Sequence, residues 1–511
     1  MSMITTFAPV VESIVGITGG YTALLPLGLM ILAALILPGI YLVSRNRTAC
    51  TAFFLVMLVI SIIVNLILLL GGFGNGVEDA HAKVYNGLYE YTKFAGIAIL
   101  LFQMVAFIVG LVSQASNETT RLHYGAYLSL LLVATAGMSS VALAGDLIAI
   151  FVGVEATSIP SYVLVAMKRK DPRAAEAAVK YVIIGGLSTA LTVYGISMLY
   201  GVTGTTNLAE LGLLIGDKFT WALAIGLITM IAGYGFKIAA VPFHMWAPDV
   251  YEGAATPVSI LLATGSKKMG LLVFVKIFLL MFVTATAFQG TEAIQYTFAI
   301  IATITMTVGN IVAISQTNIK RMLAYSSVAQ AGYILIILAI MTPYALAGGV
   351  FHMFTHVVMK GGAFLIVGAL ICAGVGEKIA DYRGLAKRAP FLAFAMMLFL
   401  FSLAGIPPLA GFTSKFVLFS AAFYDGAGAV SYQWVWLAFV AVLNSAISLY
   451  YYARVVKAMY IEKGASEEPV TVPKAFTVAI VLCVIGVIVL GVYPQIILGP
   501  IMDACSAFLT I

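Results

Sequence analysis

The 511-residue sequence contains very few charged residues. Asp, Glu, Lys and Arg together make up 9% of it, and hydrophobic residues make up 62%. Soluble domains carry roughly 25% charged residues. So little charge excludes an ordinary water-soluble protein and indicates a membrane protein.

Cysteines and nucleotide-binding motifs are scarce or missing as well. The sequence contains no CxxC pair, so neither an iron–sulfur cluster nor a zinc site is predicted. It also has no GxGxxG fingerprint that opens a βαβ unit and no Walker-type phosphate loop. We therefore expect no bound cofactor or metal, and any redox chemistry must reside in other chains. The four cysteines are scattered over apolar stretches at Cys50, Cys372, Cys483 and Cys505.

Long apolar runs, in contrast, recur along the chain. Each is about 20 residues long, which is enough for a helix to cross the roughly 30 Å hydrocarbon core of a bilayer. Membrane-spanning strands would need shorter, alternating segments, so the runs predict an all-α polytopic protein with about 14 transmembrane helices. The predicted spans are 22–43, 49–71, 94–113, 124–143, 146–167, 176–201, 219–250, 256–283, 293–314, 321–341, 344–373, 390–424, 433–460 and 473–498.

Basic residues are distributed unevenly between the predicted loops. Of the 27 Lys and Arg residues, 17 fall in loops on one side of the membrane and only Lys83, Lys93 and Lys218 in loops on the other. The positive-inside rule makes the first side the inner one, which places both termini outside the cell membrane. Because topology explains the net charge of +6, we expect no nucleic-acid partner. The inner-side residues are Arg45, Arg47, Arg121, Lys168, Arg169, Lys170, Arg173, Lys320, Arg321, Lys378, Arg383, Lys387, Arg388, Arg454, Lys457, Lys463 and Lys474.

Two predicted spans, 219–250 and 390–424, are too long for one straight helix. Each would extend about 50 Å at 1.5 Å per residue. The first contains Lys237 followed by Pro242, and the second contains a Pro-Pro pair before Lys415. Since proline interrupts the helical hydrogen bonds, we predict that both helices are discontinuous.

The two predicted breaks lie five spans apart. Discontinuous helices at corresponding places in two halves are typical of inverted-repeat transporters. We therefore predict three N-terminal helices, two inverted five-helix repeats and a C-terminal helix. The corresponding residues are 1–123, 124–283, 284–460 and 461–511.

Glu155 is the only acid predicted to lie deep in the membrane. It is about nine residues into its span, roughly 14 Å from the outer end. A charged carboxylate there costs several kcal/mol unless it is paired, so it should face the bundle interior beside a basic group, or titrate. A purely structural ion pair is the alternative. Asp146, at the outer end of the same span, is predicted to be a helix N-cap.

Three lysines are candidates for proton transfer because of their depth. Lys237 and Lys415 flank the predicted helix breaks, and Lys267 lies about midway along its span. Lys268 points about 100° away from Lys267 around the helix, so the two cannot share one small pocket.

Other charged residues lie nearer the membrane surfaces. Lys276 is placed to extend toward the outer interface. Lys180, four residues after Glu176, lies near the inner surface, where it either stabilises its helix or takes part in proton uptake. Asp249 and Glu252, on the same side, are expected to be solvated.

Histidines supply further candidates. His352, His356 and Lys360 repeat at i, i+4 and i+8 and form a polar stripe on one helix face. The stripe suits a proton relay, whereas zinc would need a third ligand that the sequence does not provide. A packing role for one of the two histidines is the alternative. His244, just after the first break, either connects the central lysines to inner water or packs a loop.

Several segments of the chain carry a family resemblance, namely FVGVEATSIPSYVL, KIAAVPFHMWAPDVYEGAATPVS, NIKRMLAYSSVAQAGY and SLAGIPPLAGFTSKF. Together they resemble the antiporter-like membrane subunits of respiratory complex I and its relatives, a proton-conducting family that also occurs in multisubunit cation/proton antiporters. Within this family, WAPDVYEGA followed by ATGSK is most similar to the branch called subunit N.

The resemblance implies a 14-helix subunit in which each inverted repeat forms half of a proton pathway. It marks Glu155, Lys237, Lys267 and Lys415 as the proton-transfer residues. His356 and Lys360 correspond more loosely to polar positions of the family.

The resemblance also implies a non-redox subunit of a larger translocase. Other membrane-arm subunits and peripheral redox subunits would be its partners, with electrons passing from NADH or coenzyme F420H2 to quinone or methanophenazine. A hydrogenase-linked complex is a further alternative. In the implied mechanism redox energy perturbs Glu155, and protons move from Lys237 to Lys415 and outward.

Two other functions remain open. The first is a cation/proton antiporter subunit that exchanges sodium for protons, although a lysine side chain cannot ligate a cation. The second is a non-conducting scaffold that fills the membrane arm of the assembly.

Overall fold

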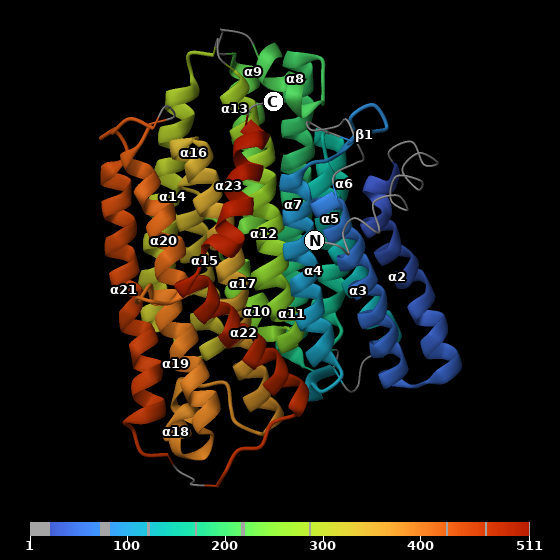
Figure 1. The fold of residues 1–511 in the computed structure, drawn as a ribbon, viewed down its shortest axis with the longest axis vertical. Helices are drawn as coiled ribbons and strands as arrows, with labels where there is room; N and C mark the ends of the chain where they lie inside the picture. Colours follow the sequence, from blue (N-terminus) through green and yellow to red (C-terminus); the bar gives the residue numbers. More distant parts are fainter. Residues whose placement is uncertain are drawn as a thin grey trace.

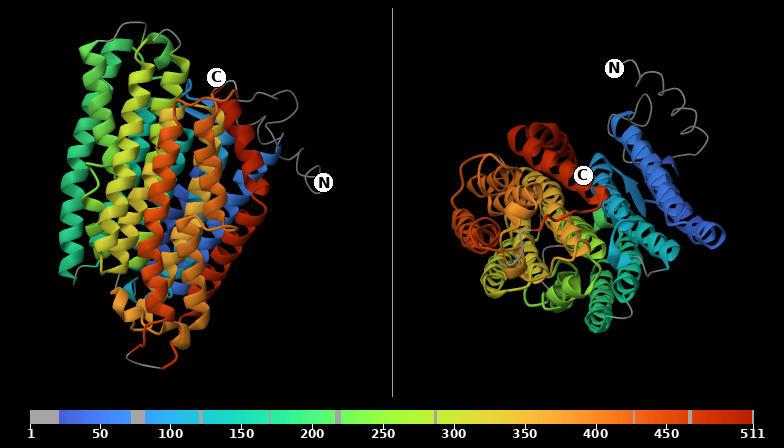
Figure 2. Two further views of the ribbon diagram at one scale, coloured as in Figure 1. Left: turned by 90° about the vertical axis from the view of Figure 1, so that its left-hand side faces the viewer. Right: turned by 90° about the horizontal axis from the view of Figure 1, so that it is seen from below.

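The computed structural model describes residues 21–71, 82–119, 123–168, 171–215, 220–285, 288–425, 428–464 and 468–509. These residues form a bundle of helices whose axes are roughly aligned (Figures 1 and 2). Within the described ranges, 12 helices are long and apolar enough to cross a membrane, which confirms the predicted all-α membrane fold. Three shorter apolar helices accompany them, so the total of fourteen spans stays a prediction.

The first two long helices that the structure describes lie at one edge of the bundle (Figure 1). They expose much of their surface, and a small hairpin precedes α4. These elements are α2 (Leu25–Ser44), α3 (Arg47–Gly71), β1 (Ala82–Val84), β2 (Tyr89–Tyr91) and α4 (Lys93–Ser113).

The next group contains the first broken helix. Its members are α5 (Tyr124–Leu143), α6 (Leu147–Ala166), α7 (Pro172–Thr203), α8 (Leu208–Leu214), α9 (Trp221–Ile238), α10 (Trp246–Gly253), α11 (Thr256–Ile260), α12 (Lys267–Phe274) and α13 (Leu280–Thr284). The last three belong to one continuous helix, 256–284, because two π-helical stretches join them.

The third group contains the second broken helix, and two helices close the chain. They are α14 (Thr291–Ser315), α15 (Ile319–Ile334), α16 (Ile337–Ile340), α17 (Pro343–Cys372), α18 (Leu385–Arg388), α19 (Pro390–Ala404), α20 (Ala410–Ser420), α21 (Val435–Tyr460), α22 (Lys474–Val492) and α23 (Gln495–Leu509).

Helix starts follow local sequence signals. Asp146 caps α6 by accepting a hydrogen bond from the backbone N–H of Ile148 at 2.7 Å, as predicted. Thr342 caps α17 in the same way, and Pro343 follows it at a position where its missing N–H costs nothing. These signals explain why most predicted boundaries agree with the structure to within a few residues.

Both predicted helix breaks are confirmed. α9 ends at Ile238 and is followed by the C-cap residue Ala239, whose φ of 55° is left-handed; α10 begins at Trp246. α19 ends at Ala404 and is followed by Gly405 with φ of 95°; α20 begins at Ala410. The prolines lie inside the two gaps. The division of the chain into inverted repeats stays a prediction.

One predicted span is wrong, and one helix was not predicted. The span 473–498 is divided into α22 and α23, because Pro494 interrupts the backbone hydrogen bonds while the apolar composition continues on both sides. The helix that was not predicted is the short α8. Arg121, Arg169, Lys170 and Lys218 lie outside the described residues, as do both termini, so the orientation in the membrane stays a prediction.

The core lies around α17. Every residue of this helix from Ala345 to Leu370 is buried, including its three ionisable side chains. α15 crosses the bundle beside it and is almost as fully enclosed. The polar side chains of these two helices can therefore be satisfied only by other protein groups or by internal water.

Candidate functional site

Glu155 and Lys237 line one small cavity between α6, α7 and α9. The cavity has a volume of about 10 Å³, close to the smallest space that holds a water molecule. Lys237 Nζ donates a hydrogen bond to Ser158 Oγ at 2.7 Å, and Ser158 lies one turn after Glu155 on α6. Glu155 Oε1 accepts a hydrogen bond from Thr189 at 2.9 Å. The two charges are therefore neighbours, each held by a hydroxyl group.

The prediction that Glu155 faces the bundle interior is only partly correct. The residue is half-buried, since it lies beside an exposed apolar face of α6 that includes Val152 and Ile159. Its carboxylate nevertheless turns toward the cavity that it shares with Lys237.

The helix break determines where Lys237 lies. The residue occupies the last turn of α9, where Trp246 of α10 donates its indole N–H to the carbonyl oxygen of Phe236 at 2.9 Å. The Lys237 ammonium is 5.9 Å from the centre of the Tyr181 ring, within the range of a cation–π contact. An aromatic cluster thus holds both sides of the break around the lysine.

Lys267 and Lys268 are buried, and neither ammonium has a hydrogen-bond partner among the described residues. Lys267 Nζ lies 5.7 Å from the ring of Tyr251. Lys268 lines a separate, mostly apolar cavity of about 20 Å³, which confirms that the two side chains occupy different surroundings. A buried charge without a partner is costly, so this arrangement fits groups that exchange protons rather than permanent structural cations.

The three residues of the polar stripe on α17, His352, His356 and Lys360, differ in their hydrogen bonds. The two ring nitrogens of His352 form 2.9 Å hydrogen bonds with Ser414 and Gln330. The ring of His356 is centred 6.3 Å from that of His352, and neither of its nitrogens has a partner among the described groups. Lys360 Nζ donates to the carbonyl oxygen of Leu323 at 3.1 Å and to the hydroxyl group of Ser326.

Lys415 reaches back across the second break. Its ammonium donates to the carbonyl oxygens of Leu403 and Ala404, at 2.7 and 3.3 Å, and to the Ser445 hydroxyl at 2.8 Å. The last carbonyls of a helix have no partner within it and carry partial negative charge. Lys415 therefore caps α19 from the far side of the gap.

Hydrogen bonds connect His352 to Lys415. Gln330 accepts a hydrogen bond from His352 Nε2 through its side-chain oxygen, and its Nε2 group donates to the Leu403 carbonyl oxygen at 3.3 Å. Ser414 contacts His352 from the residue next to Lys415. Hydrogen-bonded groups therefore connect His352 to Lys415 without a gap. Between Lys237 and His356, in contrast, the described residues form no direct hydrogen bonds.

The ammonium group of Lys180 belongs to a chain of ion pairs at the predicted inner end of the bundle. It pairs with Glu176 at 2.6 Å, as predicted, and with Asp249 at 2.7 Å. Arg321 joins Asp249 to Glu252 at 2.6 and 3.0 Å. The expectation that these two acids are merely solvated is therefore wrong, because cations of two other helices face them.

His244 lies in the first break, half-buried. Its ring is centred 6.4 Å from that of Tyr325 on α15, and its Nδ1 atom has no partner among the described atoms. The structure brings it near the axis without joining it to a lysine by a hydrogen bond.

The placement of Lys276 contradicts the prediction that it extends to the outer interface. Only 6% of the residue is exposed, and its ammonium donates to the carbonyl oxygens of Ala142 and Ala144 at 2.6 Å each. The end of α5 supplies these free carbonyls, so the lysine finds acceptors inside the protein.

A second charged cluster closes into a ring of six side chains. In order around the ring they are Glu118, Lys168, Asp171, Arg173, Glu377 and Lys320. Burial alone would raise the pKa of Glu118, but Lys320, Lys168 and the backbone N–H of Thr256 lower it to about 2. Lys320, predicted in a loop, is instead completely buried in the first turn of α15.

The hydroxyl and amide partners of the buried charges were not predicted from the sequence. Ser158 lies one turn after Glu155 on α6, so helical spacing places it near that candidate residue. Its hydrogen-bond partner Lys237 belongs to another helix, as do the partners of Ser414, Gln330 and Ser326, and spacing along one helix gives no signal for such contacts. Within the described ranges, the four cysteines are unpaired and no group of three potential metal ligands occurs.

Comparisons with known proteins agree with this arrangement. The model of the family described as NADH:quinone oxidoreductase/Mrp antiporter, transmembrane, matches residues 144–448. Subunit N of the F420H2 dehydrogenase of Methanosarcina mazei is 43% identical over 410 residues, covering 78% of this chain and 80% of the relative. Subunit N of the NADH-quinone oxidoreductase of Heliobacterium modesticaldum is 43% identical over 382 residues, covering 74% and 77%.

Solved structures share the fold. A chain of the archaeal membrane-bound sulfane sulfur reductase superimposes with a TM-score of 0.84 at 26% identity, covering 95% of this chain and 97% of that one. A chain of respiratory complex I from Thermus thermophilus gives 0.75 at 26% identity, covering 93% and 99%. A chain of the Mrp complex from Dietzia gives 0.82 at 21% identity, covering 94% and 97%, which shows a common fold.

Proposed function

Because the chain belongs to the NADH:quinone oxidoreductase/Mrp antiporter transmembrane family, we propose that it is the proton-translocating membrane subunit of a complex I-like, redox-driven pump. The observation that carries the proposal is the row of buried ionisable side chains that leads from Glu155 to Lys415 through the core. Similarity to both subunit N relatives supports electron transfer from NADH or F420H2 to quinone or methanophenazine in partner subunits.

The proton path begins at the cavity shared by Glu155 and Lys237. A change of charge near Glu155 alters the proton affinity of Lys237, because hydroxyl groups and at most about one water separate the two groups. Moving one proton against 100 mV requires about 2.3 kcal/mol, which a pKa change of about two units at a lysine supplies.

The proton then crosses the core. Lys267 and His356, which have no partners among the described side chains, receive it through internal water. His352 is hydrogen-bonded to Ser414 and Gln330, and Gln330 and Lys415 both donate to the Leu403 carbonyl oxygen. Because that oxygen cannot pass a proton on, internal water carries the proton from His352 to Lys415. Release takes place on the side of the membrane to which α20 leads, which is the predicted outer side.

The predicted inner side supplies the protons. Lys180 and Asp249 form an ion pair at the predicted inner end of the bundle, and His244 lies in the first helix break near Tyr325. This orientation places both termini outside the cytoplasmic membrane and matches the basic loops predicted to lie inside.

The experiment that tests the proposal is substitution of Lys237 in the intact complex, with proton pumping and electron transfer measured together in proteoliposomes. Lys237→Ala is expected to lower the protons moved per electron while electron transfer continues. The exposed Lys463 provides a control, since Lys463→Ala leaves both unchanged. Full pumping by Lys237→Ala would instead identify a scaffold.

A cation/proton antiporter subunit is the alternative, since the matching family also includes Mrp antiporter subunits and the chain shares the fold of a chain of the Mrp complex. Five buried lysines of the core argue against it, because ammonium groups repel sodium and cannot coordinate it. They are Lys237, Lys267, Lys268, Lys360 and Lys415. Sodium flux that disappears in Glu155→Ala would establish this alternative.

A further inference from the structure

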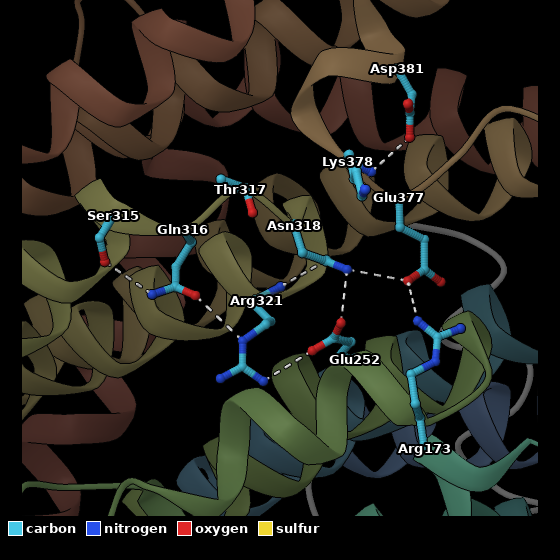
Figure 3. Close-up of a pocket in the computed structure, with 10 residues that line it drawn as sticks. All are labelled: Arg173, Glu252, Ser315, Gln316, Thr317, Asn318, Arg321, Glu377, Lys378 and Asp381. Carbon is cyan, nitrogen blue, oxygen red and sulfur yellow. Dashed lines mark hydrogen bonds and ion pairs between the residues drawn. The ribbon is translucent and has the colours of Figure 1, made fainter.

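A series of buried polar groups follows α15 from a charged surface pocket to α17, and the path described above does not use it. The pocket has a volume of about 690 Å³ and lies at the predicted inner end of the bundle. Figure 3 shows Asn318 between the carboxylates of Glu252 and Glu377, with Arg173 and Arg321 on either side. Arg173 is 59% exposed, so bulk water reaches these acids.

Lys320 is the first group behind the pocket. It is completely buried, and its ammonium lies 3.1 Å from Glu377 Oε1 and 3.6 Å from Glu118 Oε1. Glu377 is thus both a wall of the wet pocket and the partner of an enclosed lysine. A proton taken from water by Glu377 is one short transfer from the interior.

Lys360 is the next charged group, and it turns toward α15 rather than toward Lys267. Its ammonium contacts the Leu323 carbonyl oxygen, one helical turn after Lys320, and the hydroxyl group of Ser326. Ser326 is completely buried. The hydroxyl group can accept a proton on one lone pair while it donates its own, as a relay requires.

Beyond Lys360, both α17 and α15 carry polar residues at intervals of four positions. On α17, His356 and His352 follow toward the opposite end at intervals of four residues. On α15, Gln330 lies four residues after Ser326. Both series meet at His352, whose ring nitrogen forms a 2.9 Å hydrogen bond with Gln330. Gln330 and Lys415 both donate to the Leu403 carbonyl oxygen, so only one shared acceptor separates them, and internal water completes the transfer to Lys415.

We propose that α15 carries a second proton-uptake route, which leads from the pocket through Lys320 and Ser326 to Lys360. From Lys360 the proton reaches His352 and Lys415 without passing Glu155 or Lys237. Each transfer moves one proton from a donor to the lone pair of its acceptor, and water in the pocket replaces it. Internal water carries the proton from Lys320 to Ser326, because no hydrogen bond among the described residues joins these two side chains. The inference rests on the proposed function, because it assumes that Lys415 releases protons.

The test uses the intact complex in proteoliposomes, driven by its own electron donor, with protons moved per electron as the readout. Lys237→Met is expected to retain part of the pumping that this subunit contributes. Adding Ser326→Ala to that variant lowers the remainder about tenfold, the effect of losing one hydrogen bond to a charged group. Ser327→Ala is the matched control, since Ser327 is buried next to Ser326 and its hydroxyl has no partner among the described residues.

Lys360→Met in the Lys237→Met background provides a second test and should act like Ser326→Ala. Lys360→Arg keeps the positive charge but cannot release a proton, so it should not restore pumping. Ser→Ala removes a single oxygen atom, which keeps the packing and allows the complex to assemble.

The outcomes separate the two proposals. If Lys237→Met alone abolishes this subunit's pumping while electron transfer continues, the second route is wrong and the proposed function stands. The same conclusion follows if neither Ser326→Ala nor Lys360→Met lowers the remainder. If every variant pumps like the unmodified complex, the proposed function fails together with the second route.

Discussion

The ammonium of Lys415 lies 2.7 Å from the carbonyl oxygen of Leu403, on the opposite side of the second helix break. The two residues are only 12 positions apart, yet a continuous helix would keep them about 18 Å apart along its axis. The break therefore creates the contact. It gives a buried lysine a set of acceptors and at the same time satisfies carbonyls that the interrupted helix leaves free.

Lys415 has a structural role and a proton-transfer role, and two substitutions separate them. Lys415→Met leaves buried carbonyls unsatisfied and should lower the free energy of unfolding by about 1–3 kcal/mol, as well as proton pumping. Lys415→Arg keeps a donor for the carbonyls but not an exchangeable proton, so it should recover thermal stability in detergent without pumping. Pumping at the normal level in Lys415→Arg would contradict a proton-transfer role.

Ser158 should matter for transport because its hydroxyl holds the Lys237 ammonium at 2.7 Å. Ser158→Ala removes this hydrogen bond and is expected to slow redox-driven pumping about tenfold. Ser161→Ala is the control, since Ser161 lies one turn further along α6, is equally buried and donates to the backbone of Thr157. Equal effects of the two substitutions would assign the loss to helix packing instead.

The two histidines of α17 should respond differently to replacement by leucine. Both ring nitrogens of His352 are hydrogen-bonded, so His352→Leu leaves buried partners unsatisfied and should cost about 2–4 kcal/mol of stability. His356 has no partner among the described residues, so His356→Leu should change stability by less than about 1 kcal/mol while it lowers pumping. Thermal unfolding measures the effect of each substitution on stability, and a pumping assay measures its effect on proton transport. A large loss of stability in His356→Leu would indicate that His356 has a packing role.

Glu118 should make the stability of the bundle depend on pH. Its folded-state pKa of about 2 lies below its ordinary value of 4.5, so the stabilisation is fully present above pH 4.5 and is lost as the pH falls toward 2. Linkage gives about 3 kcal/mol for this difference. At pH 7 the melting temperature of Glu118→Gln should therefore be lower than that of the unmodified protein.

The difference in melting temperature should narrow as the pH is lowered from 4.5 toward 3, because the unmodified carboxyl group loses its advantage there. Asp381→Asn, which alters an exposed carboxylate, serves as the control and should have little effect. A difference that stays constant across this range would show that the charge of Glu118 contributes nothing to stability.

The candidate site was predictable from sequence to different degrees. Glu155, Lys237, Lys267 and Lys415 stand out because few ionisable residues occur at those depths, and depth follows directly from position along a helix. The burial of Lys320 was not predictable in the same way. It follows a loop and precedes an arginine, and only its placement against Glu118 and Glu377 from two distant segments encloses it.

The sequence by itself determined the all-α membrane fold and the positions of the two helix breaks. Hydropathy, helical rise and proline act over a few neighbouring residues, so they can be read locally. Only the tertiary structure decided which partner each buried charge contacts. Lys237 and Ser158 are 79 positions apart, and Lys360 and Ser326 belong to different helices. Such contacts depend on how helices pack around one another, and the spacing of residues along one chain does not specify that packing.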